Sequence, residues 1–212
     1  MSKVRAGISM SLDGYVAGPD QSRQSPLGVG GEQLHSWVTR LTVWREQHGM
    51  EGGEENVSSA VVREATENVG AQIMGRGMFG PPEGGPADES WMGWWDEDPP
   101  FHMPVFVITH HEREPLRLSD TTFTFVTDGV ESALAQARAA AGGKDVFIGG
   151  GASIINQYLA SGALDELDVN LVPLLLGSGA RLLEGVGPEI KLEQLRAIDA
   201  PGVTHIKYRV SN

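Results

Sequence analysis

A run of three glycines lies where an apolar segment ends and residues with helical spacing begin. Glycine has no Cβ, so such a run allows the backbone to approach a neighbouring group closely. The unpaired N–H groups at the start of a helix favour an anion, and this combination predicts a phosphate cradle. Its candidate residues are Gly149, Gly150, Gly151, Ala152 and Ser153. Isoleucine at 154 breaks the G-x-G-x-x-G fingerprint, no Walker A motif occurs, and tight helix–sheet packing remains open as the alternative.

Two more strand ends carry groups suited to an anion. Gly75 and Arg76 follow a short apolar strand, and the planar fork of an arginine matches a phosphate. If a dinucleotide lay across the strand ends, this arginine would suit the 2′-phosphate that distinguishes NADP from NAD. Thr109 and His110, at the end of another strand, would join the same rim. An arginine exposed at the surface without a ligand is the alternative for Arg76.

Asp13, between a predicted strand and Gly14, is the candidate catalytic carboxylate. Asp-Gly is also a common turn dipeptide, so a turn-forming role stands beside the catalytic one. Trp91, Trp94 and Trp95 lie in a Gly/Pro-rich loop over 80–100, where they could cover a substrate or form a dimer contact.

Metal chemistry and nucleophilic hydrolysis are disfavoured. Adjacent His110 and His111 would point to opposite faces of a strand, and no HExxH motif accompanies them. The chain has no cysteine, and GGASI does not match the G-x-S-x-G motif of a serine hydrolase. We therefore expect no metal site.

The composition excludes several partners. With 16 Lys and Arg against 28 Asp and Glu, the formal net charge is −12, which disfavours nucleic acid and anionic membrane surfaces. No apolar stretch has the length of a signal peptide or of a membrane span, and the absence of cysteine fits a reducing compartment. We expect a cytoplasmic protein.

Alternating strand-like and helix-like segments predict an α/β layered fold. Strands are expected near 3–10, 15–17, 72–74, 104–110, 121–126, 145–149, 167–176 and 205–210, and helices over 32–45, 57–69, 131–141 and 152–161. The helix over 152–161 would bury Ile154, Ile155, Tyr158 and Leu159 on one face. Residues 177–203 are expected to form a loop, and the late strands an antiparallel edge of a mixed sheet. No linker divides the chain, so 1–212 is expected to be one domain.

Four segments in order, SLDGYVAG, MGR, VFVITHH and IGGGASIINQYLASGALDELDVNLVPLLLGSGARLLEG, give the chain a recognisable pattern. It resembles the dihydrofolate reductase-like family that includes the C-terminal reductase domain of the bifunctional riboflavin-biosynthesis protein, over roughly residues 3 to 210. The resemblance implies a three-layer sandwich around a mixed, mostly parallel sheet. It also implies NADPH-dependent reduction of a small, pterin- or pyrimidine-like heterocycle, as in 5-amino-6-(5-phosphoribosylamino)uracil reductases, by a homodimer.

The resemblance also assigns roles. Gly75, Arg76, Thr109 and His110 would meet the adenosine 2′-phosphate, and the glycine run with Ala152 and Ser153 the pyrophosphate. Ala17 and Gly18 would border the nicotinamide, and Asp13 would face the substrate.

The chain departs from the family pattern at two places. Gly149 stands where riboflavin reductases carry a glutamate. Dihydrofolate reductases place a carboxylate one turn into the first helix, where this chain has Gln33, Leu34 and His35, with Glu32 nearby. Two hypotheses follow: an NADPH-dependent reductase, and a non-catalytic NADP-binding or ligand-sensing protein on the same fold.

Overall fold

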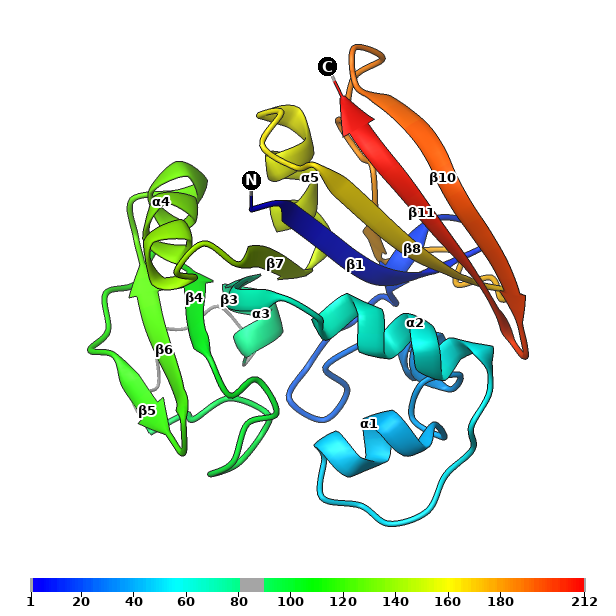
Figure 1. Ribbon diagram of the computed structural model, residues 1–212, viewed down its shortest axis with the longest axis horizontal. Helices are drawn as coiled ribbons and strands as arrows, with labels where there is room; N and C mark the ends of the chain where they lie inside the picture. The colour runs from blue at the N-terminus through cyan, green and yellow to red at the C-terminus, as the bar shows by residue number, and fades with distance from the viewer. Residues whose placement is uncertain (1, 81–89, 212) are drawn as a thin grey trace.

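The computed structural model describes residues 2–80 and 90–211, whose arrangement Figure 1 shows. Within these residues, nine strands form one sheet in the order β10-β11-β8-β1-β7-β3-β4-β6-β5. Their bounds are β1 Val4–Ser11, β3 Val69–Gly75, β4 Pro104–Ile108, β5 Leu116–Leu118, β6 Thr121–Val126, β7 Asp145–Gly150, β8 Glu166–Val172, β10 Lys191–Ala200 and β11 Val203–Ser211. A small second sheet pairs β2 (Tyr15–Ala17) with β9 (Ala180–Arg181).

The centre of the main sheet is parallel. β8, β1, β7, β3, β4 and β6 run in one direction, whereas β5 at one edge and β11 and β10 at the other pair antiparallel. The predicted mixed, mostly parallel sheet is therefore confirmed. Because parallel strands end at the same edge, the residues that follow β1, β7, β3 and β4 are neighbours, and ligands of open α/β sheets bind at this edge.

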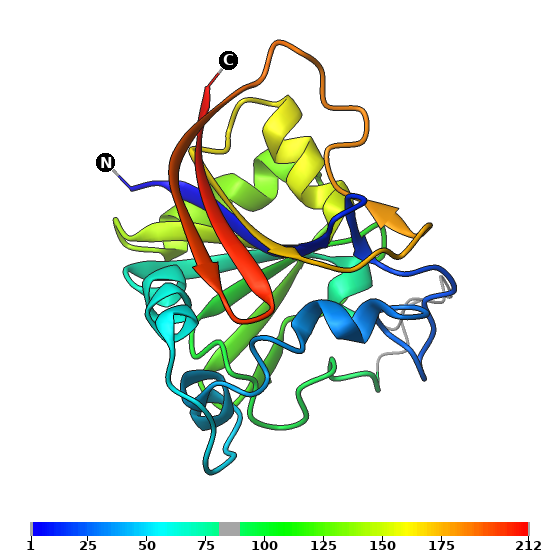
Figure 2. The same ribbon diagram turned by 90° about the vertical axis from the view of Figure 1, so that its right-hand side faces the viewer.

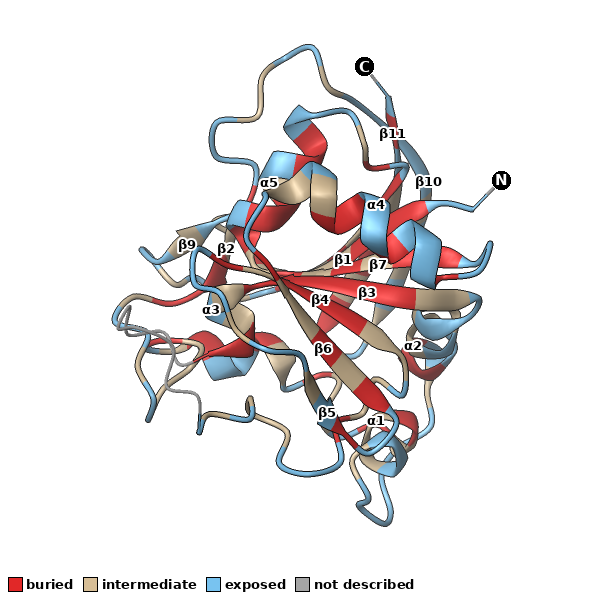
Figure 3. Ribbon diagram, turned by 90° about the vertical axis from the view of Figure 1, so that its left-hand side faces the viewer, coloured by how far each residue is buried: buried red, intermediate tan, exposed pale blue. Residues whose placement is uncertain are grey.

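Helices cover both faces of the sheet and make a three-layer sandwich (Figure 3). On one face lie α4 (Val130–Ala140) and α5 (Ala152–Ala160). On the other lie the 3-10 helix η1 (Gly31–His35), α1 (Thr42–Gln47), α2 (Val57–Thr66) and the one-turn helix α3 (Arg76–Phe79). The largest core cluster fills the layer under α4 and α5, and the predicted apolar face of α5, from Ile154 to Leu159, is buried in it.

Two helix predictions need correction. The helix expected over 32–45 is interrupted: η1 ends at His35, and Leu41 is extended before α1 begins at Thr42. The interruption lets Leu34, Trp37 and Leu41 all reach the same core cluster, and Leu41 forms a β-bridge with Glu54. The helix expected over 57–69 ends at Thr66, since Val69 already begins β3.

The prediction of a loop over 177–203 is wrong. β10 occupies Lys191–Ala200 and pairs with β11 as a long hairpin at the sheet edge, in orange and red in Figure 2. Most of its residues are exposed, so its sequence lacks the apolar alternation that indicates a half-buried strand. β5 was also not predicted, because it is only three residues long.

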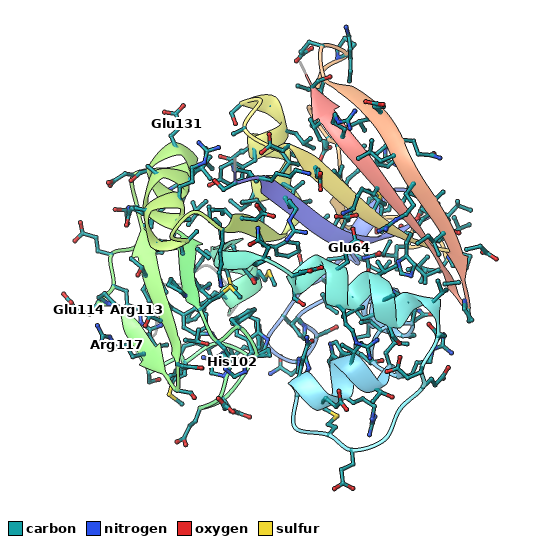
Figure 4. All side chains as sticks on the ribbon, in the orientation of Figure 1. Glu64, His102, Arg113, Glu114, Arg117 and Glu131 are labelled. Atoms are coloured by element: carbon teal, nitrogen blue, oxygen red, sulfur yellow. The ribbon has the colours of Figure 1, made fainter. Side chains whose placement is uncertain are left out.

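The helices η1, α1 and α2 are fastened to the sheet by polar contacts as well as by packing. Glu64 on α2 accepts a hydrogen bond from Lys207 of β11 at 2.8 Å and pairs with Arg196 of β10 at 2.8 Å (Figure 4). Trp37, after η1, donates its indole N–H to Ser9 Oγ of β1 at 3.1 Å. These contacts fix the position of η1 beside the end of β1.

Candidate functional site

A cavity of about 580 Å³ opens at the carboxyl ends of β1, β7 and β3. Its walls come from the strand ends, β2 and β9, η1 and the loop before it, α3, the start of α5, and two tryptophans near residue 95. The lining residues are Ile8, Val16, Ala17, Gln21, Pro26, Leu27, His35, Gly75, Arg76, Gly77, Met78, Trp94, Trp95, Gly149, Gly151, Ala152, Ser153, Ile154 and Ala180. Most residues predicted to bind a cofactor therefore meet in one cavity.

The glycines at these strand ends differ in how much space a side chain would have. A Cβ on Gly149 would approach Gln72 Nε2 to 2.5 Å, and one on Gly75 would approach Ile154 Cγ1 to 2.8 Å. Gly150 has a φ of +120°, which only glycine adopts readily. At Gly151, by contrast, a Cβ would meet nothing within 4 Å, although the residue lines the cavity. Packing therefore explains Gly75 and Gly149, and backbone conformation explains Gly150, while Gly151 leaves room for a ligand to approach the backbone.

The start of α5 faces the same space. Gly151 is its N-cap, with no side-chain cap and no acidic residue in the first turn. The positive end of the helix dipole and the uncapped amides there favour an anion. Ala152 and Ser153 at this helix start line the cavity, as the sequence predicted.

A smaller hollow adjoins the cavity at Arg76. Arg76 lines both, and the hollow is completed by Thr109, His111, Arg113 and aromatic residues. Burial and the nearby Arg113 guanidinium lower the pKa of Arg76 below its usual value. The two cationic side chains thus lie near each other at this hollow, and guanidinium groups are well suited to bind phosphate.

The sequence analysis missed Arg113 and overstated His110. Arg113 lies on a connection after β4, with its guanidinium 5.0 Å from the centroid of the Phe125 ring (Figure 4), and no motif marks it. His110 is exposed and lines neither hollow, whereas Thr109 is buried and its hydroxyl accepts a hydrogen bond from the His111 amide at 3.1 Å.

Asp13 does not line the cavity, and its carboxylate is hydrogen-bonded to neighbouring groups. Its carboxylate accepts hydrogen bonds from Ser11 Oγ at 2.6 Å, from the Leu176 amide at 3.1 Å and from the Gly177 amide at 2.7 Å. These bonds, the Ser11 one foremost, lower the pKa of Asp13 to about 2. The geometry is that of a side chain that ties the β1–β2 turn to the loop after β8, which is the turn-forming alternative.

Ala17 lines the cavity, whereas Gly18 supports the loop behind it. The Gly18 amide donates to the Leu27 carbonyl at 2.8 Å, and a Cβ on Gly18 would come within 2.0 Å of the Val29 carbonyl oxygen. Glycine at 18 therefore lets residues 18–31 fold back on themselves, which places Leu27 and Pro26 in the cavity wall.

His35, which the sequence analysis named only as a departure from the family pattern, also lines the cavity. Its Nδ1 is closed off from solvent and has no hydrogen-bond partner among the described residues. Burial lowers the pKa of this imidazole below its ordinary value. The sequence gives no sign that His35 lines a cavity, because the predicted continuous helix over 32–45 is interrupted after this residue.

Of the described residues, Asp98, His102 and Asp120 form the group with metal-ligand character, with their ligand atoms within 4.8 Å of one another. All three are exposed, and none lines the cavity. His102 Nδ1 contacts Asp120 Oδ1 at 2.6 Å, which lowers the pKa of the Asp120 carboxyl and gives the pair a structural explanation without an ion.

Comparisons with known proteins agree with this fold. The chain is 31% identical over 78 residues to the uncharacterized protein YwjB of Bacillus subtilis (strain 168), a match that covers 37% of this chain and 44% of that protein. A structure from Shewanella sp. PV-4, whose provisional name places it in riboflavin biosynthesis, is similar with a TM-score of 0.68 and 21% identity over 99% of both chains.

A dihydrofolate reductase from Enterococcus faecalis in complex with NADP(H) aligns with a TM-score of 0.51 and 10% identity, over 99% of this chain and 95% of that one. This likeness confirms the predicted dihydrofolate reductase-like fold. None of the helices in the described ranges has the length and apolar character needed to cross a bilayer. The family model of the RibD C-terminal domain matches residues 2–204, and the chain therefore belongs to that family.

Proposed function

We propose that the protein is an NADPH-dependent reductase that transfers a hydride to a small heterocycle of the pterin or pyrimidine type. The observation that carries the proposal is the open space at Gly151, beside the uncapped start of α5, in a cavity that shares Arg76 with the smaller hollow. One cavity thus offers a backbone cradle for a pyrophosphate and a separate cationic end for a further phosphate. Membership of the RibD C-terminal domain family supports the reductase class.

The residues present fit the coenzyme. Gly149, Gly150 and Gly151 with the first turn of α5 would hold the pyrophosphate. Arg76 and Thr109, joined by Arg113, would hold the 2′-phosphate, and Ala17 would border the nicotinamide. The placement of Gly18 and His110 supports a direct contact less well than that of their neighbours, for the reasons given above.

When bound, NADPH supplies a hydride to an electron-poor carbon of the substrate. The protein's own part is to orient the substrate and to exclude water from the reacting carbon. The apolar wall formed by Ile8, Val16, Leu27 and the two tryptophans suits the second task. Asp13, bonded to the loop after β8, would hold the β1–β2 turn that carries Ala17 into the cavity.

A ligand-sensing NADP-binding protein is the second candidate. It is favoured by one observation: no carboxylate is found among the described residues that line the cavity. As further parts of the proposal, residues 1–212 act as one domain, in the cytoplasm, as a homodimer. Sedimentation analysis of the purified protein measures the last of these.

The test is a titration of the purified protein with NADPH and with NADH, followed by energy transfer from tryptophan to the nicotinamide. We expect tight NADPH binding and much weaker NADH binding. The diagnostic variant is Gly151→Ala, whose added Cβ meets no protein atom within 4 Å and whose backbone is extended. Its thermal unfolding should be unchanged while its NADPH affinity falls about tenfold, roughly the loss of one good contact.

Two results would contradict the proposal. The first is that neither nucleotide binds to the wild-type protein. The second is that Gly151→Ala binds NADPH as well as the wild type does, because the space at Gly151 would then not be where the coenzyme lies. NADPH binding without reduction of any pterin, pyrimidine or quinone offered would favour the sensing protein.

A further inference from the structure

A second pocket lies between α2 and the sheet, and none of its described lining residues belongs to the coenzyme cavity. Its volume is about 150 Å³, and a cavity of about this size holds one benzene ring. Its walls come from α2, the segment after η1, and strands β1, β7, β8, β10 and β11. We call it the α2 pocket, and its aromatic and charged lining residues are Trp37, Glu64, Phe147, Asp168, Arg196 and Lys207.

The sheet is accessible beneath the α2 pocket, although β1 and β7 are inner strands. Gly7 of β1 and Phe147 of β7 line the pocket and are only half-buried, whereas their neighbours Ala6 and Ile148 are fully buried. A Cβ on Gly7 would come within 3.1 Å of Phe147 Cζ, so the missing side chain makes room for the phenyl ring. With Trp37 as a further wall, the pocket has two aromatic side chains.

The two cations of the α2 pocket are already paired with one carboxylate. Glu64, which Figure 4 labels on α2, accepts a hydrogen bond from Lys207 Nζ at 2.8 Å and pairs with Arg196 Nη1 at 2.8 Å. Both oxygens of Glu64 are therefore engaged. An anionic ligand would have to displace Glu64 from these cations, so the pocket does not favour an anion.

A second carboxylate in the pocket, Asp168, is not satisfied in this way. Among the described residues, its nearest cationic neighbour is Lys207, whose Nζ is 3.6 Å from Asp168 Oδ2, too far for a good hydrogen bond. The same lysine is closer to Glu64. Asn170, two residues further along β8, already accepts a hydrogen bond from His205 Nδ1 at its Oδ1 atom, at 2.6 Å. The Asp168 carboxylate is thus the acceptor in the described lining that a ligand can complete.

The surroundings of Asp168 favour a cation. Burial raises the pKa of its carboxyl above the ordinary value, and Lys207 offsets this only in part. A positive group that brings its own N–H donors compensates a carboxylate in such a setting. Trp37 and Phe147 add to the preference, because aromatic rings attract cations and pack against flat π-systems.

We propose that the α2 pocket binds a small aromatic cation with two adjacent N–H donors, of the arylamidinium type, which pairs with the Asp168 carboxylate. The ring of this ligand packs against Phe147 and Trp37, while Glu64 keeps its two cations. The ligand contacts both α2 and the sheet, so its binding stabilises the folded protein. The α2 pocket is separate from the coenzyme cavity, and this inference does not depend on the proposed function.

The first experiment compares three ligands of matched shape and different charge. Isothermal titration of the purified protein without coenzyme would use benzamidine, which is cationic, benzamide, which is neutral, and benzoate, which is anionic. We expect benzamidine to bind at least about tenfold more tightly than benzamide, and benzoate not to bind. Equal or tighter binding of benzamide or benzoate overturns the inference. The absence of benzamidine binding also overturns it, since the pocket would then hold water alone.

The second experiment changes the pocket. Asp168→Asn removes the charge at nearly constant shape and should weaken benzamidine at least about tenfold, to the level of benzamide. Asp199→Asn, at an exposed carboxylate on β10, is the matched control and should leave the affinity unchanged. Phe147→Leu removes an aromatic wall and should weaken benzamidine and benzamide alike, several-fold. Unchanged benzamidine binding in a folded Asp168→Asn or Phe147→Leu variant contradicts the proposed site.

Titration of benzamidine into protein saturated with NADP⁺ separates the α2 pocket from the coenzyme cavity. We expect the same benzamidine affinity with and without NADP⁺. Displacement of benzamidine by NADP⁺ would place the cation in the coenzyme cavity and overturn the inference, even if Asp168→Asn does not fold. If NADP⁺ does not bind to the wild-type protein, the proposed function fails, while the matched ligands and the pocket variants still decide the present inference.

Discussion

The two ends of the cavity are built differently. At the β3 and β7 end, the wall consists of Gly75, Gly149 and Gly151, the uncapped start of α5, and the side chain of Arg76 at the first position after a strand. At the β1 end, the wall consists of side chains from the loop before η1 and of His35 on η1, whereas Trp94 packs at Gly80 on the Arg76 side. The first end contains the charged side chain of Arg76, whereas the second is lined mainly by apolar side chains, with Gln21 and His35 as its polar groups.

The two kinds of wall depend on the fold to different degrees. A backbone cradle at a strand end depends on the sheet, so it follows from the fold. A pocket wall made of loop side chains depends on a few residues that can change without affecting the core. The four predictions below test this contrast in order of decreasing effect on the ligand.

Gly150→Asp should nearly abolish coenzyme binding, with a loss of about 100-fold or more in NADPH affinity. The residue has a φ of +120°, which strains any side chain, and a carboxylate there would repel the phosphates. Gly150→Ala, which carries the same strain without the charge, separates the two causes. An Asp variant that binds NADPH normally would place the pyrophosphate elsewhere.

Arg76→Ala should weaken NADPH about 10- to 100-fold, the range expected for a lost charge-assisted pair, and leave NADH binding unchanged. Arg113→Gln should have the same selectivity with a smaller effect, because Arg76 lines both hollows and Arg113 only one. Fluorescence titration with both nucleotides measures this. Equal losses for NADPH and NADH would show that the arginine does not read the 2′-phosphate.

Trp94→Ala should change the cavity wall beside α3, one turn after Arg76. Trp94 lies so close to Gly80 that a Cβ there would meet its indole at 2.5 Å, so the ring has a fixed position in the wall. Its removal should weaken an uncharged heterocycle several-fold, by about 1 kcal/mol of stacking, with no change in NADPH affinity. A parallel loss of NADPH binding would mean that the two ends are not separate.

Asp13→Asn should have the smallest effect on ligand affinity and act on stability instead. The folded-state pKa of about 2 lies below the ordinary value of 3.8, so the ionised carboxylate stabilises the fold above about pH 4, and this contribution is lost as the pH falls toward 2. The Tm of the Asn variant should therefore be lower than that of the wild type at pH 7, and the difference should vanish near pH 2.

The same variant tests the predicted catalytic role of Asp13. If turnover disappears while the Tm and NADPH affinity are unchanged, Asp13 is a reactive group despite its bonds to the loop after β8. If only stability changes, the turn-forming alternative holds. Neither result alters the assignment of the glycine run.

Short sequence patterns predicted part of the candidate site. The glycine run, Gly75-Arg76 and the buried face of α5 depend on strand–turn–helix patterns a few residues long, and all three lie where these patterns predict. Arg113 and the cavity face of His35 could not be found in this way. The first lies on an irregular connection, and the second lies at the end of η1, a short 3-10 helix that the helical period did not separate from the residues after it.

The sequence by itself determined the α/β class, the antiparallel late strands of a mixed sheet, the strand ends marked by glycine, and the acidic net charge. These follow from periodicity, glycine placement and charge, which act over a few residues or over the whole chain. Only the tertiary structure decided which polar groups face the cavity. Asp13 accepts hydrogen bonds from the amides of residues 176 and 177, which are distant in sequence and become its neighbours only when the sheet has formed. Among the described residues, His35 Nδ1 has no such partner.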